Sequence, residues 1–123
     1  MAVEHTHPDD GRPVAVEVVT PSVTSQNLDE KLGRRPHSCD GSRVAADMAA
    51  ALPGWRWCEL ESHGYTVVDV DHRRTAVEWW FVDSVLERCT GERLGHHIVV
   101  PADEPRVSTV AGRRAELLPT SAA

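Results

Sequence analysis

The sequence predicts an α+β fold made mainly of short strands, with one hairpin and one or two helices. Residues 65–70 and 75–85 are rich in β-branched and aromatic residues and flank a short polar turn, which is the pattern of a hairpin. A β-branched run at 14–20 predicts another strand. An alanine-rich segment at 42–52 carries apolar residues at helical spacing, so strand and helix signals occur together.

The N-terminal part of the chain contains one predicted strand and one short helix. We expect residues 1–13 to be a disordered tail or linker, because the segment is polar, contains two prolines and lacks periodicity. Residues 14–20 follow as a mostly buried strand that Pro21 ends. A helix is expected over residues 26–32, and Gly33 closes it.

The middle of the chain predicts a loop, a helix and a short extended segment. Residues 33–41 contain several helix-breaking residues and indicate a loop. The helix follows over residues 42–52 and stops at Pro53. Residues 55–60 alternate as a short strand or an extended segment, and residues 62–64 mark a turn.

The hairpin carries the clearest core signal. Residues 71–74 form its turn, and Val77, Trp79 and Phe81 share the face of its second strand that we expect to enter the core. The last predicted elements are short strands at 98–101 and 106–110 and a disordered tail at 111–123. One domain, at 14–110, is therefore expected between two disordered ends.

The charge balance disfavours one broad class of function. The chain has 13 Lys and Arg residues against 19 Asp and Glu, a net charge of −6, so it repels phosphate backbones and no nucleic-acid partner is predicted. No apolar stretch approaches the roughly 18 residues of a membrane-spanning helix, so no transmembrane segment is predicted. The spacing of Cys39, Cys58 and Cys89 favours reduced structural thiols.

Histidines are numerous, but their spacing does not predict a metal site. His5 and His7 fall in the expected tail, and strand alternation sends His96 and His97 to opposite faces. A hydrolytic metal site needs three or more converging ligands. The sequence also contains no phosphate-binding loop motif and no nucleophile elbow. We therefore predict neither a metal ligand nor a catalytic residue in this chain.

The strand and loop at residues 17–25 contain polar residues that could contribute to a functional site. A carboxylate inside an apolar strand needs a partner or a pocket, and the loop after that strand supplies hydroxyl groups. Such loops at strand ends commonly carry sites in α/β sheets. The resulting candidates for a substrate-side loop are Glu17, Thr20, Ser22, Thr24 and Ser25. Capping and turn formation explain the same hydroxyls, and that alternative stays open.

Two long segments resemble a known enzyme family. Residues 11–30 read GRPVAVEVVTPSVTSQNLDE, and residues 57–70 read WCELESHGYTVVDV and are followed by VEWWFV at 77–82. In this order and spacing they resemble the alkaline phosphatase D family, the PhoD-type metallophosphoesterases, especially their actinobacterial members. The resemblance spans residues 11–110, so the predicted domain is similar to the C-terminal portion of a metallophosphoesterase-type α/β sandwich.

The resemblance implies a function that depends on another part of the enzyme. Intact members hydrolyse phosphate monoesters and diesters with bound iron and calcium, and they are often exported by the twin-arginine route. Their metal ligands lie upstream of the matched part, and the chain contains none of those ligand motifs. We therefore expect no activity from this chain alone, no cofactor bound by it, and a location that the chain itself does not reveal.

The resemblance also implies partners, because the metal-binding half of the family's enzymes is not part of the matched segments. One alternative is a non-catalytic interaction module, and another is a subunit that complements a separate N-terminal metal-binding half; self-association is also expected of exposed strand edges. The loop at 20–25 would then lie near the active-site mouth and support it. The chain departs from the family at Leu52-Pro53-Gly54, where Asn-Pro-His is frequent, and at Asp71-His72-Arg73-Arg74, where Thr-Pro-Glu-Arg is frequent.

Overall fold

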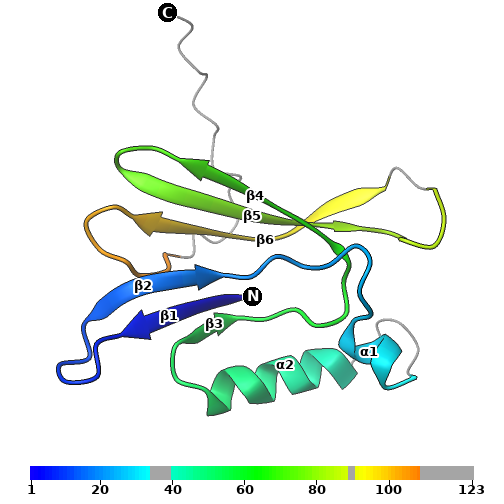
Figure 1. Ribbon diagram of the computed structural model, residues 1–123, viewed down its shortest axis with the longest axis horizontal. Coiled ribbons are helices and arrows are strands. Elements are labelled where there is room, and N and C mark those ends of the chain that lie inside the picture. Colours follow the sequence, from blue (N-terminus) through cyan, green and yellow to red (C-terminus); the bar gives the residue numbers. More distant parts are fainter. Residues whose placement is uncertain (34–39, 89–90, 109–123) are drawn as a thin grey trace, which may run out of the picture.

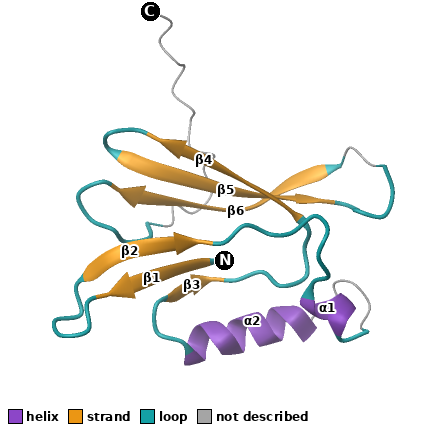
Figure 2. Cartoon of the chain, in the orientation of Figure 1, coloured by secondary structure: helices purple, strands orange, loops and turns teal. Residues whose placement is uncertain are grey.

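Two small antiparallel sheets and two helices make up the described part of the fold. The computed structural model describes residues 1–33, 40–88 and 91–108. One sheet has the strand order β2-β1-β3 and the other β4-β5-β6 (Figure 1). The strands are β1 (Ala2–Thr6), β2 (Pro13–Val18), β3 (Trp55–Trp57), β4 (Gly64–Val70), β5 (Arg74–Val82) and β6 (Glu92–Pro101). The helices are α1 (Leu28–Lys31) and α2 (Asp40–Ala51), and this composition agrees with the predicted α+β class (Figure 2).

The prediction of a disordered tail at residues 1–13 was wrong. Residues 2–6 form β1, the central strand of its sheet, with Val3 opposite Glu17 on β2 and opposite Trp55 on β3. Ala2 is fully buried. The segment is too short and too polar to show strand periodicity, so its strand conformation comes from pairing on both sides.

Strand β2 is less buried than predicted. It lies at the edge of its sheet, and Val14 is 49% exposed. Val16 and Val18 are partly buried and pack on the core, while Glu17 on the other face is exposed. The β-branched run therefore forms a strand, as predicted, but only part of one face contacts the core.

Both helices lie where the sequence predicts them. In the turn before α1 the backbone N–H of Asn27 donates to Oε2 of Glu30 at 2.7 Å, and the helix ends before Gly33, which has φ of 61°. Helix α2 runs beside β3 (Figure 1). Gly54 follows it with φ of 88°, where a Cβ would lie 2.2 Å from the carbonyl oxygen of Glu4. Only glycine fits this turn into β3.

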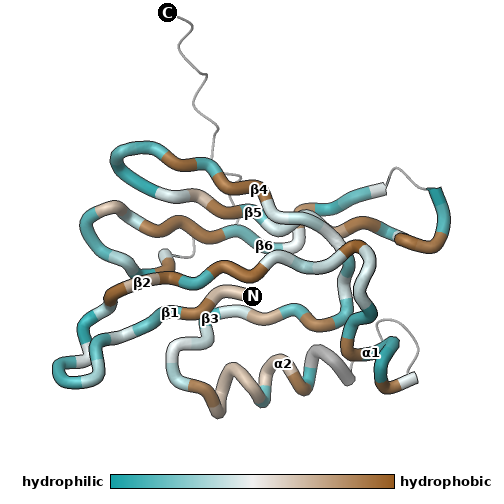
Figure 3. Tube along the Cα trace, viewed as in Figure 1, coloured by the Kyte–Doolittle hydropathy of each residue, from teal (hydrophilic) through white to brown (hydrophobic). Residues whose placement is uncertain are grey.

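The two sheets share one hydrophobic core. The predicted inward face of β5 is confirmed: Val77, Trp79 and Phe81 are 1%, 0% and 3% exposed. Ile98 from β6 and Ala2 from β1 complete the cluster. Residues from both sheets therefore hold the fold together, as the hydrophobic segments of the facing strands in Figure 3 also indicate.

Strand β6 is longer than predicted. It spans Glu92–Pro101, whereas the sequence indicated a strand only at 98–101. The pairing register shifts between Trp79 and Trp80, so Gly95 has no partner on β5, and a Cβ at Gly95 would lie 2.0 Å from the ring of Phe81. This bulge interrupts the alternation of inward and outward residues, so the sequence pattern does not predict the first half of the strand.

The elements predicted near the C-terminus lie only partly within the described residues. Ser108 forms an isolated bridge with Val99, while residues 109–110 of the predicted strand and the predicted tail at 111–123 lie outside the described residues. Residues 34–39 of the predicted loop also lie outside them. No helix in the described ranges is long and apolar enough to cross a membrane.

His96 links the two sheets and makes stability depend on pH. Its ring stacks on Trp57 with centroids 4.4 Å apart, and its Nε2 is buried without a hydrogen-bond partner in the described structure. Burial, together with the neighbouring His97, lowers the pKa of His96 from 6.5 to about 4. The folded chain therefore binds fewer protons than the unfolded chain between these pH values.

We expect the fold to lose stability as the pH falls from 7 to 4. Full burial would make the His96 shift worth about 3 kcal/mol, and partial solvent exposure of the ring reduces this to about 1–2 kcal/mol. Urea unfolding at both pH values measures the loss, and His96→Phe, which keeps an aromatic ring, should abolish that part of it. His72→Phe in the exposed turn is the control, and an equal effect there would contradict the assignment.

Candidate functional site

The predicted hydroxyl loop forms a structural turn. The Oγ of Ser22 accepts hydrogen bonds from the backbone N–H of Thr24 at 3.1 Å and of Ser25 at 2.7 Å. Thr24 and Ser25 are exposed. The alternative interpretation, in which these hydroxyls make a turn, therefore describes their observed hydrogen bonds.

Glu17 does not join this loop. Its Oε2 lies 2.9 Å from Nε2 of His5, and both side chains are about half exposed, at 51% and 49%. The carboxylate thus has the ion-pair partner expected for it, but the pair faces solvent on the sheet of β1 and β2. His5 belongs to a strand and not to a tail.

Thr20 lines a cavity of about 170 Å³ with Cys58 and three aromatic rings. Its Oγ1 accepts a hydrogen bond from Thr66 Oγ1 at 3.0 Å. Burial raises the pKa of the Cys58 thiol, so this thiol is a poor nucleophile at neutral pH. The cavity brings together apolar surface and a protonated thiol.

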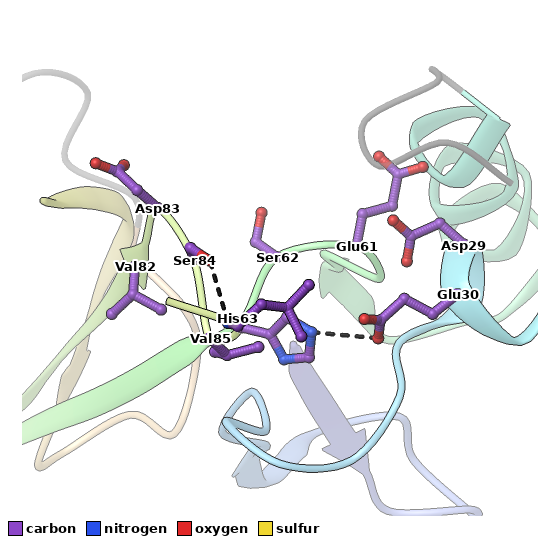
Figure 4. A pocket seen from close by; sticks show the side chains of 10 residues that line it. Asp29, Glu30, Glu61, Ser62, His63, Val82, Asp83, Ser84 and Val85 are labelled. Atoms are coloured by element: carbon purple, nitrogen blue, oxygen red, sulfur yellow. Dashed lines mark hydrogen bonds and ion pairs between the residues drawn. The ribbon is translucent and has the colours of Figure 1, made fainter. Parts of the chain in front are cut away.

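A second cavity gathers acidic side chains from three parts of the chain. It has a volume of about 130 Å³ and lies between α1, the turn before β4 and the segment after β5 (Figure 4). Its polar lining residues are Asp29, Glu30, Glu61, Ser62, His63, Asp83 and Ser84, and its apolar ones are Val82, Val85 and Leu86. This is the candidate functional site, and we call it the acidic cavity.

His63 joins the walls of the acidic cavity. Its Nδ1 lies 2.8 Å from the carbonyl oxygen of Ser22, and its Nε2 lies 3.2 Å from Oε2 of Glu30. A carbonyl and a carboxylate only accept hydrogen bonds, so a protonated ring nitrogen of His63 is the donor in each contact that forms. His63 thus connects the loop at Ser22 with α1 through its two ring nitrogens.

Asp29 is the least satisfied polar group of the acidic cavity. The residue is 4% exposed, and its Oδ1 is buried with no hydrogen-bond partner in the described structure. Figure 4 shows its carboxylate between those of Glu30 and Glu61, directed toward the cavity. A buried carboxylate oxygen without a donor is costly to the fold.

Sequence reasoning missed this cavity because two distant segments build it. Asn27 Nδ2 donates to the carbonyl of Glu61 at 3.0 Å, and the backbone N–H of Leu28 donates to the carbonyl of Leu60 at 3.1 Å. These contacts bring α1 beside the turn at 61–63. No local sequence signal indicates this association, because it depends on hydrogen bonds between segments more than 30 residues apart.

The residues of the acidic cavity do not fit iron or calcium. Among residues 1–33, 40–88 and 91–108, no three His, Cys, Asp or Glu side chains are grouped closely enough to hold a metal ion. Iron and calcium sites need more converging ligands than the Glu30 and His63 pair provides. No hydrolytic step is therefore assigned to these side chains.

Comparisons with known proteins identify no relative. No family model, curated protein or solved structure matches the chain significantly. Its function is therefore inferred from its residues and their geometry.

Proposed function

We propose that this chain is the C-terminal, non-catalytic part of a PhoD-type phosphoester hydrolase, and that it completes a separate half which binds iron and calcium. In this proposal the two small sheets are the C-terminal portion of a metallophosphoesterase-type sandwich. Hydrolysis of phosphate monoesters or diesters then requires the metal-binding half, because metal charge activates the attacking water.

The contact between the two family-like segments carries the proposal. Residues 11–30 and 57–82 are distant in sequence, yet Nε1 of Trp79 donates to the carbonyl of Val19 at 3.0 Å, and Thr66 donates to Thr20. His63 and Asn27 add further bonds between the same segments. These bonds hold the two segments in one folded unit, as the proposal requires.

Exposed apolar side chains on β4 supply a surface for the other half. Val67, Val68 and Val70 are 43%, 53% and 67% exposed, and β4 is an edge strand whose outer side pairs with no described strand. Figure 3 shows hydrophobic segments along this edge. Such an edge binds another strand or polypeptide, which also accounts for the alternative of an interaction module that self-associates.

Complementation tests the proposal. The partner is the metal-binding half of an intact PhoD-type enzyme, ending before the segment that resembles residues 11–30. With iron and calcium present, we expect chromogenic monoester or diester hydrolysis from the mixture that exceeds the sum of the two parts. Val70→Lys should reduce it about tenfold, because a lysine at the strand edge opposes pairing.

Val14→Lys is the matched control, since Val14 is an exposed valine on the edge strand of the other sheet. It should leave hydrolysis by the mixture unchanged. A mixture of two folded parts that neither associates nor hydrolyses would reject the proposal. Light scattering on the chain alone separates the alternative, which predicts a mass above that of the 13.5 kDa monomer.

A further inference from the structure

We draw no further inference here: the strongest candidate, the apolar cavity beside Thr20 and Cys58 that residues of both sheets line, holds a single cysteine above the almost fully buried rings of Trp79 and Phe81, and nothing in the described part of the chain shows what would occupy it.

Discussion

Trp79→Ala should remove a large part of the stability of the fold at 25 °C. Trp79 is fully buried, contacts Trp57 with centroids 4.9 Å apart, and donates from Nε1 to the carbonyl of Val19. Removing so large a side chain leaves a cavity between the sheets, and the carbonyl of Val19 then keeps only the N-terminal ammonium group of Met1 as a donor. The expected cost is about 3–5 kcal/mol, a large part of the roughly 5–15 kcal/mol of a typical domain.

Trp80→Ala is the matched comparison for this prediction. Trp80 is the next residue on β5 and faces the opposite side, where its Nε1 donates to Glu78 at 2.9 Å and its ring is only partly buried. Its loss should cost about 1 kcal/mol. Urea unfolding followed by tryptophan fluorescence and circular dichroism measures both variants. Equal destabilisation would contradict the assignment of the inward face of β5.

Arg56→Met should destabilise the fold more than Glu4→Gln. The carboxylate of Glu4 is 4% exposed, and its Oε2 accepts from Nε of Arg56 at 2.7 Å and also from Nη2. Its Oε1 accepts from the backbone N–H of Val107 at 2.6 Å. Removing the arginine leaves a buried carboxylate with one donor, whereas removing the charge of Glu4 leaves an arginine that is half exposed.

The expected cost of Arg56→Met is about 2–3 kcal/mol, below the usual 3–5 kcal/mol for a buried pair because the guanidinium is 49% exposed and Val107 still donates. The double variant should recover most of this loss. Free energies of unfolding for the two single variants and the double variant complete the cycle. Additive effects in this cycle would mean that the two side chains do not interact.

Local sequence patterns predict the elements whose conformation does not depend on contacts with distant parts of the chain. The alternation of Val77, Trp79 and Phe81 fixes the inward face of β5, and Gly33 marks the end of α1. Strand β1 has no such signal, because only its pairing with β2 and β3 makes it extended. The bulge at Gly95 likewise breaks the period that would have predicted the first half of β6.

The candidate site depends even more on tertiary contacts. Asp29 looks like an ordinary acidic residue of a short helix, and His63 like part of a turn, until the bonds from Asn27 to Glu61 place them beside one cavity. Glu17 shows the opposite case. An apolar strand suggested a buried carboxylate, but β2 is an edge strand and the carboxylate meets His5 at the surface.

Hydrolysis by the purified chain alone tests the central claim most directly. The assay uses chromogenic phosphate monoesters and diesters with added iron and calcium, and a blank that contains the metals without protein. The account predicts no turnover above the blank, because no described group of side chains can hold the metal ions that would activate water. Metal-dependent turnover that co-purifies with the folded chain would contradict it.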